Sequence, residues 1–264
     1  MTPRERWGWR ARFGILVIDK DPVAETEFWS LAPPGVGVNA ARFESPRRPG
    51  TDFYGEDPGR RVAETPGIST GLAIFGQMQL DAICLCFVTS SFLGGITFDE
   101  RFGELGKATA NGTPVTTGAQ AITAAAAHLG IQRPFVVVPP WFKDEIIDAA
   151  AAYFTEADLP PSGIRRFDLG TGWATMAPWQ TWDAGAQWSV RPEDLYRQIR
   201  RGVPAGSDSV IVAGSGFRAI EVIEPIEADL GIPVLTSNQA GLWQCLRLAN
   251  VHAPVAGGGR LLAC

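Results

Sequence analysis

The sequence has few of the residues from which metal, thiol and histidine-based sites are built. It holds 4 Cys and 2 His among 264 residues. Neither His128 nor His252 has a partner at the spacing of a metal site or a catalytic triad. The cysteines also lack zinc-site spacing: Cys84, Cys86, Cys245 and Cys264. We therefore expect no metal, and thiols that stay reduced and inert.

Other absences exclude further classes of protein. The sequence has no six-residue dinucleotide fingerprint, no Walker loop and no Gly-x-Ser-x-Gly elbow, so no cofactor is expected. A net charge of −5 gives no reason to expect nucleic acid. No apolar run approaches the roughly 20 residues of a membrane helix. The basic N-terminus is not followed by an apolar signal core, which predicts a cytoplasmic protein.

What the sequence does contain is a repeat. Residues 81–87 and 208–214 are both strand-like, begin at an Asp and run into small hydroxyl or glycine residues. Two further pairs of segments match in the same order, at a similar offset of about 120 residues: 12–18 with 133–139, and 113–121 with 232–240. Three ordered matches predict two similar lobes, and a cleft between lobes is a common place for a small ligand.

Buried strand patterns alternate with helical ones, which is typical of parallel α/β sheets. Strands are predicted at 13–18, 36–43, 82–88, 134–139, 209–213 and 233–236. Helices are predicted at 60–79, 98–110, 118–129, 143–157, 192–202, 217–230 and 239–249. The expected fold is therefore α/β, with two pseudo-symmetric parallel-sheet lobes and the site in the cleft between them. Its parts are one lobe of 13–117 plus 236–264, a second lobe of 118–235, and an N-terminal extension of 1–12.

Ligands of parallel sheets bind beyond the carboxyl ends of the strands. Here those ends include Thr89, Ser90, Ser215 and Gly216, whose backbone N–H groups beside helix starts suit a carboxylate or an oxyanion. Helix capping is the competing explanation for each such turn.

The first predicted strand ends in charged residues. Asp19, Lys20 and Asp21 are either a solvated turn or an acid/base group in the cleft. Arg218 could pair with a substrate carboxylate or lie on a helix surface.

Residues 170–190 carry four tryptophans without a helical or strand period. They form either a loop pinned to the surface or a lid that gives the cleft an aromatic wall.

These segments resemble the aspartate/glutamate racemase superfamily and, within it, the branch of maleate isomerase and arylmalonate decarboxylase. The resemblance runs from about residue 13 to 262 and is most specific at residues 223–243. Residues 87–95 and 213–218 resemble the family's two active-site loops, and 139–143 its third strand end. The resemblance implies a site between two lobes and cofactor-free chemistry at the carbon next to a carboxylate.

The sequence departs from the family where the family's catalytic cysteines stand. Phe87 and Gly214 occupy those two positions, and Trp141 replaces the usual Tyr. Cys86 is one residue early, so in a strand it points to the opposite face. These departures argue against thiol-based racemisation or maleate isomerisation. Together with the tryptophan-rich segment 170–190, they favour a bulky or aromatic carboxylate over a small diacid, and Val88 in the first loop is a further substrate-binding residue.

Two functions follow. The first is a lyase or isomerase that decarboxylates its substrate or shifts a proton through an enolate-like intermediate, with Asp21, Lys20 and Ser215 as the catalytic residues. The second is a non-catalytic protein that binds a small carboxylate. The expected partner in both cases is a small-molecule carboxylate, with homo-oligomerisation left open.

Overall fold

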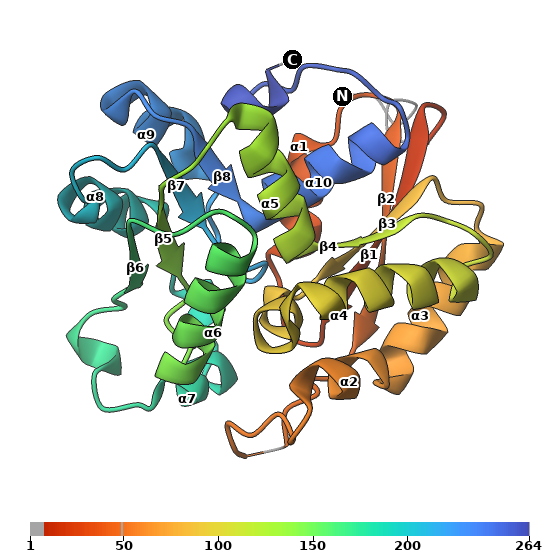
Figure 1. The fold of residues 1–264 in the computed structure, drawn as a ribbon, viewed down its shortest axis with the longest axis horizontal. Coiled ribbons are helices and arrows are strands. Elements are labelled where there is room, and N and C mark those ends of the chain that lie inside the picture. The colour runs from red at the N-terminus through yellow and green to blue at the C-terminus, as the bar shows by residue number, and fades with distance from the viewer. Residues whose placement is uncertain (1–7, 49, 264) are drawn as a thin grey trace.

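The fold consists of two four-stranded parallel sheets that lie side by side (Figure 1). A computed structural model describes residues 8–48 and 50–263. The first sheet has the order β2-β1-β3-β4 and the second β6-β5-β7-β8. The first is built from β1 (Ala11–Ile18), β2 (Val36–Phe43), β3 (Ala82–Cys86) and β4 (Val115–Thr117). The second is built from β5 (Pro134–Val138), β6 (Gly163–Arg166), β7 (Ser209–Val212) and β8 (Val234–Thr236). The prediction of two parallel-sheet lobes is confirmed.

The repeated aspartate has a structural role at the start of the central strands. Asp81 Oδ2 accepts the backbone N–H of Arg12 at 2.7 Å, and Asp81 N–H donates to Arg12 O at 2.8 Å. In the second lobe Asp208 Oδ2 accepts from Arg133 N at 2.9 Å, and its N–H donates to Arg133 O at 3.2 Å. The same side chain thus fixes the register of β3 on β1 and of β7 on β5.

Helices cover both faces of each sheet and fill the space between the lobes. They are α1 (Ala24–Leu31), α2 (Pro58–Ala63), α3 (Pro66–Gln77), α4 (Val88–Thr109), α5 (Gly118–Leu129), α6 (Asp144–Glu156), α7 (Pro178–Asp183), α8 (Pro192–Gly202), α9 (Ile223–Leu230) and α10 (Ser237–Leu248). Short 3-10 turns lie at Thr171–Trp173, Ala186–Trp188, Ile220–Val222 and Arg260–Leu262. Helices α5 and α10 pack against each other between the two sheets (Figure 1).

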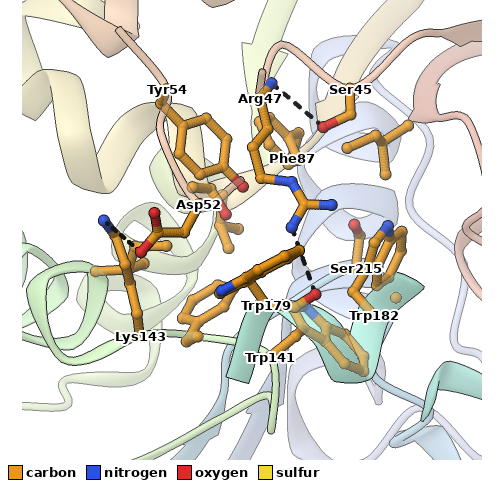
Figure 2. A pocket seen from close by; sticks show the side chains of 17 residues that line it. Ser45, Arg47, Asp52, Tyr54, Phe87, Trp141, Lys143, Trp179, Trp182 and Ser215 are labelled. Carbon is orange, nitrogen blue, oxygen red and sulfur yellow. Dashed lines mark hydrogen bonds and ion pairs between the residues drawn. The ribbon is translucent and has the colours of Figure 1, made fainter. Parts of the chain in front are cut away.

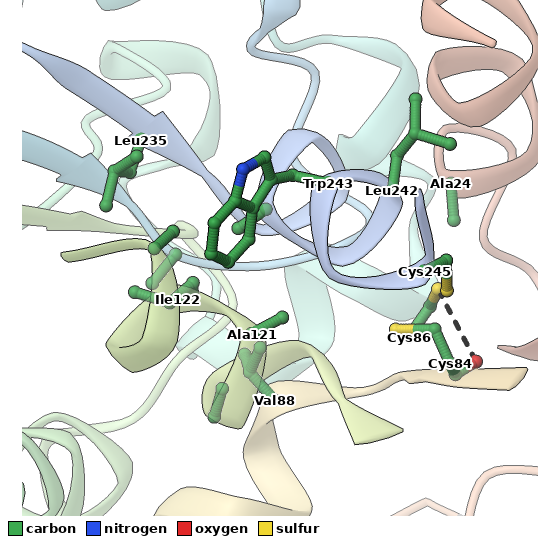
Figure 3. Close-up of a cluster of buried hydrophobic side chains, with 14 of the residues drawn as sticks. Ala24, Cys84, Cys86, Val88, Ala121, Ile122, Leu235, Leu242, Trp243 and Cys245 are labelled. Carbon is green, nitrogen blue, oxygen red and sulfur yellow. Dashed lines mark hydrogen bonds between the residues drawn. The ribbon is translucent and has the colours of Figure 1, made fainter. Parts of the chain in front are cut away.

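One hydrophobic core runs through both lobes. It joins Cys84 of β3 and Leu242 of α10 with Ile122 of α5 and Leu235 of β8 (Figure 3). Because all of these side chains are buried in one cluster, the two lobes are held as a unit. The boundaries predicted for the lobes stay a prediction.

The structure departs from the predicted elements in several places. The expected helix 98–110 begins already at Val88, directly after β3, and bends at Gly95, where φ is 70°. The expected helix 60–79 is divided at Pro66, which starts α3. Helix α9 begins six residues later than predicted, after a 3-10 turn. Helix α1 and the short strands β4 and β6 were not predicted, because each is too brief for a clear periodic pattern.

Of the predicted N-terminal extension, residues 1–7 lie outside the described part of the chain. Within the described ranges, no helix has the length and apolar character needed to cross a membrane.

Loss of the α10 cap should destabilise the fold. Thr236 is buried, and its hydroxyl accepts the N–H of Gln239 at 3.2 Å while Gln239 Oε1 accepts the N–H of Thr236 at 2.9 Å. We expect Thr236→Ala to lower the free energy of unfolding by about 1–2 kcal/mol in urea titrations. Thr155→Ala, at an exposed helical position, should change it by less than about 0.5 kcal/mol. Equal effects of the two substitutions would contradict the capping role.

Candidate active site

A pocket lies where the carboxyl ends of the two sheets face each other. Its lining residues come from both lobes (Figure 2). The end of β1 and the loop after β2 contribute Ile18, Ser45, Arg47, Asp52 and Tyr54. The ends of β3, β5 and β7, with the helix starts after them, contribute Phe87, Val88, Thr89, Trp141, Phe142, Lys143, Ile146, Gly214, Ser215 and Gly216. Helix α7 adds Trp179 and Trp182.

Most of the substrate-binding residues predicted from the sequence line this pocket: Phe87, Val88, Thr89, Trp141, Gly214, Ser215 and Gly216. Ser90 is not among the lining residues. It is fully buried, and its hydroxyl donates to Phe87 O at 2.6 Å in the first turn of α4. Ser90 therefore stabilises the start of α4, where its neighbours Val88 and Thr89 line the pocket.

Backbone N–H groups from both lobes are available at the pocket. Val88 and Thr89 are the first residues of α4, whose N-terminus carries the positive end of the helix dipole. The second active-site loop consists of residues 213–218 and is called the second loop below. The described residues offer no acceptor for the N–H groups of its Ser215 and Gly216. Free N–H groups that converge from two sides suit an anion.

A hydrogen bond joins the two loops directly. The Ser215 hydroxyl donates to Cys86 O at 2.7 Å, and so connects the end of β7 to the end of β3. The neighbouring Gly214 N–H donates to Ser237 Oγ at 2.7 Å. Two hydrogen bonds therefore hold the loop in place.

The charged residues after β1 lie in different environments. Lys20 is exposed and does not line the pocket, and its backbone oxygen accepts from Gln187 Nε2 at 3.3 Å. Asp21 is 1% exposed, and its Oδ1 accepts the N–H groups of Val23 at 2.7 Å and Ala24 at 3.2 Å. Asp21 Oδ2 has no hydrogen-bond partner among the described residues.

Asp21 lies behind the second loop. A Cβ added to Gly216 would be 3.5 Å from Asp21 Cγ. Burial raises the pKa of this carboxyl, and the N–H donors of Val23 and Ala24 and the nearby Ser215 side chain oppose that rise only in part.

The tryptophan-rich segment supplies one wall of the pocket. Trp182 is buried and packs edge-on against Trp141, with ring centroids 4.9 Å apart. Trp179 also lines the pocket, whereas Trp173 does not and Trp188 is 77% exposed. Two of the four tryptophans thus form the aromatic wall that the sequence suggested.

Comparisons with known proteins agree with this arrangement. A family model described as arylmalonate decarboxylase matches residues 72–262. Arylmalonate decarboxylase of Bordetella bronchiseptica is 30% identical over 187 residues, which cover 70% of this chain and 72% of that protein. The chain belongs to the arylmalonate decarboxylase family.

Solved structures show the same fold. The maleate isomerase Iso of Pseudomonas putida S16 has a TM-score of 0.78 at 18% identity, covering 96% of this chain and 98% of that chain. A crystal structure of arylmalonate decarboxylase has a TM-score of 0.75 at 22% identity, covering 95% and 98%. The resemblance found in the sequence is confirmed, and family membership supports an enzyme over a non-catalytic binding protein.

This arylmalonate decarboxylase family member has no room for a side chain at Gly214. Its φ is 135°, and an added Cβ would lie 2.5 Å from Pro139 Cγ. The described thiols lie elsewhere: Cys84, Cys86 and Cys245 are all buried in the core and none lines the pocket (Figure 3). Cys264 lies outside the described residues.

Several polar residues of the pocket were not identified from the sequence. Arg47, Asp52 and Tyr54 come from the Pro/Gly-rich segment after β2, in which no site residue was predicted, and Lys143 follows β5. Lys143 Nζ lies 3.5 Å from Asp52 Oδ2. Burial raises the pKa of Tyr54 to about 12, so its phenol is protonated at neutral pH.

Arg47 is more buried than Lys143, the other cation of the pocket, with 9% of its side chain exposed. Its Nη2 lies 2.6 Å from Asp183 Oδ1, and its guanidinium lies 5.2 Å from the centre of the Trp179 ring. Figure 2 shows the guanidinium pointing into the middle of the pocket. The loop after β2 and helix α7 are therefore linked through one side chain.

One other sequence-based candidate, Arg218, lies apart from the pocket. Arg218 is exposed, and its Nε donates to Glu221 Oε1 at 2.6 Å. In the described part of the chain, no three His, Cys, Asp or Glu side chains cluster in a way that could hold a metal ion.

The closeness of Pro139 predicts that Gly214 is hard to replace. Gly214→Ala adds backbone strain and an overlap with the Pro139 ring, and should cost about 2–5 kcal/mol of stability. Gly112 also has a positive φ, of 90°, but has open space around it. Gly112→Ala should cost only the strain, about 1–2 kcal/mol. Chemical denaturation of both variants measures the difference, and equal losses would show that Pro139 does not restrict the loop.

Proposed function

We propose that this protein is a cofactor-independent decarboxylase of an aryl-substituted dicarboxylate. The observation that carries the proposal is the pairing, within one pocket, of free N–H groups from both lobes with walls of aromatic side chains. The Bordetella bronchiseptica relative, an arylmalonate decarboxylase, supports the same class of substrate.

The N–H groups are proposed to bind the carboxylate that stays on the substrate. When the other carboxylate leaves as CO₂, its bonding electrons pass to the α-carbon and form an enediolate. The new negative charge lies on the oxygens of the remaining carboxylate, where Thr89, Ser215 and Gly216 can donate to it. Donors that are already in place for a developing oxyanion are typically the largest contribution to catalysis of this kind.

The aromatic walls and Arg47 are proposed to hold the rest of the substrate. An aryl group is proposed to pack against Phe87, Trp141 and Trp182, which keep water from the pocket. The Arg47 guanidinium retains donors beyond those used by Asp183 and Trp179 O, and a planar fork of this kind suits a carboxylate. Arg47 is therefore the proposed partner of the substrate's second acidic group.

Asp21 and Ser215 are the proposed source of the proton. The Ser215 hydroxyl already donates its hydrogen to Cys86 O, so its oxygen can accept from a protonated Asp21 Oδ2. The raised pKa of Asp21 favours this protonated form. The Ser215 O–H turns from Cys86 O toward the α-carbon and gives it a proton, Asp21 Oδ2 passes its own proton to the Ser215 oxygen, and a proton from water restores Asp21. The exposed Lys20 has no part in this scheme.

Phenylmalonate tests the reaction. The wild-type protein should convert it in D₂O to CO₂ and phenylacetate with one deuterium at the α-carbon, followed by NMR. Asp21→Asn and Ser215→Ala should each lower kcat by about 10²–10⁴-fold, since each removes a step of the proton path. Deuterium exchange with both carboxylates retained would instead identify a proton shift, and full activity of both variants would place the acid elsewhere.

The stability of Asp21→Asn should depend on pH in a defined direction. A raised folded-state pKa means that Asp21 stabilises the protein below its unfolded pKa, and that this contribution is lost as pH rises through the folded pKa. Asn cannot ionise. The melting temperature of Asp21→Asn relative to wild type should therefore increase as pH rises from the ordinary pKa of 3.8 through the folded pKa. A constant difference would show that the Asp21 pKa is not raised.

Turnover should not need a thiol. Because the described cysteines lie outside the pocket, Cys84→Ser and Cys86→Ser should retain activity apart from packing losses. Native protein should also resist iodoacetamide. Rapid inactivation together with one alkylated cysteine, located by mass spectrometry, would overturn this expectation.

A further inference from the structure

A second buried carboxylate lies against the loop that carries Ser215 and Gly216. Glu27 of α1 is 3% exposed. Its Oε1 accepts the N–H groups of Ala219 at 2.7 Å and Ile220 at 3.1 Å, at the far end of that loop. It does not line the pocket, so contact with a substrate cannot explain its burial.

Asn238 connects Glu27 to the loop at its near end. Its Nδ2 donates to Glu27 Oε2 at 2.7 Å and to Ser215 O at 2.9 Å. Both partners are acceptors, so the amide must present its NH₂ group to them, and Asn238 Oδ1 is left without a partner among the described residues. Because the Asn238 oxygen is buried without a partner, the side chain is held by the two hydrogen bonds that its NH₂ group donates.

The bond to Ser215 O also sets the direction of an N–H group in the pocket. The C=O of Ser215 and the N–H of Gly216 belong to one planar trans peptide, in which they point in opposite directions. Asn238 holds the carbonyl on the buried side. The Gly216 N–H is therefore directed the other way, toward the pocket that Gly216 lines.

We propose that Glu27, acting through Asn238, is the positioning residue that aims the Gly216 N–H of the second loop at the bound carboxylate. This inference deepens the proposed function and rests on the anion-binding role given there to Ser215 and Gly216. The ionised Glu27 accepts three N–H donors, whereas protonation would turn one of its oxygens into a donor that faces donors. Anion binding should then weaken when Glu27 is protonated.

The pH at which this occurs follows from the surroundings of Glu27. Burial raises its pKa to about 7, opposed by the donors from Ala219, Asn238 and Ile220. Glu221 raises the pKa further, and the nearby Arg218 is paired with Glu221. Asp21, on the other side of the loop, is the second group whose titration could alter binding and must be separated from Glu27.

Binding of phenylacetate tests the inference without requiring turnover. This monocarboxylate stays ionised between pH 5.5 and 8.5, and calorimetry gives its Kd. In the wild-type protein the Kd should rise about tenfold as pH falls through about 7. Glu27→Gln should bind about tenfold more weakly at pH 8, with no further change at lower pH, because its amide NH₂ faces the NH₂ of Asn238. A pH dependence that persists in Glu27→Gln would assign the effect to Asp21 and overturn the inference.

Glu227→Gln is the matched control. Glu227 is also buried, and it accepts the N–H groups of Val234 at 2.9 Å and Arg260 at 2.9 Å, away from the pocket. It should leave the Kd and its pH dependence unchanged. Asn238→Ala provides a second test should Glu27→Gln fail to fold: it should weaken binding about tenfold, and wild-type affinity in this variant would overturn the inference. Normal binding without phenylmalonate turnover would reject the proposed reaction and keep the positioning role.

Discussion

A single hydrogen bond between two strand ends brings the site together. Ser215 Oγ donates to Cys86 O at 2.7 Å, and each partner lies where a central strand of one lobe ends. Parallel sheets always direct their carboxyl ends to one edge, but two sheets can face each other at many angles. This bond, with the shared core around α5 and α10, selects one of them. The N–H groups at α4 and at the second loop converge only in that arrangement.

The repeat explains why the two halves of the site could become so different. Asp81 and Asp208 hold the starts of β3 and β7 in the same way, so the frame of each lobe is preserved. At the opposite ends of β3 and β7 the two lobes carry different residues. Phe87 there packs edge-on against Phe43, at 5.7 Å between ring centroids, whereas Gly214 leaves room for the Pro139 ring. One strand end supplies an aromatic surface and the other a closely packed backbone.

The sequence predicted what depends on local pattern and failed where distant segments meet. Six strands and the two hydroxyl loops follow from hydrophobic runs and their ends. Arg47 and Tyr54 could not be found, because nothing local places a Pro/Gly-rich loop against α7. Asp21 and Lys20 are adjacent and both charged, yet Lys20 is exposed while Asp21 is buried, with its Oδ1 accepting the N–H groups of Val23 and Ala24 at the start of the unpredicted helix α1. The resemblance to a family located the loops, while the burial of Asp21 required the fold.

Helix α1 gives the site its asymmetry. Asp21 lies just before this helix and Glu27 in its first turn, and both buried carboxylates lie next to the second loop. A buried carboxylate near the first loop, Asp99, instead accepts hydrogen bonds from the hydroxyl groups of Ser91, Thr117 and Tyr153. Under the proposed chemistry, a proton delivered through Ser215 reaches the enediolate from one face only. A site with an acid on both faces can interconvert mirror-image products, whereas this arrangement commits the α-carbon to one configuration and suits a decarboxylase better than a racemase.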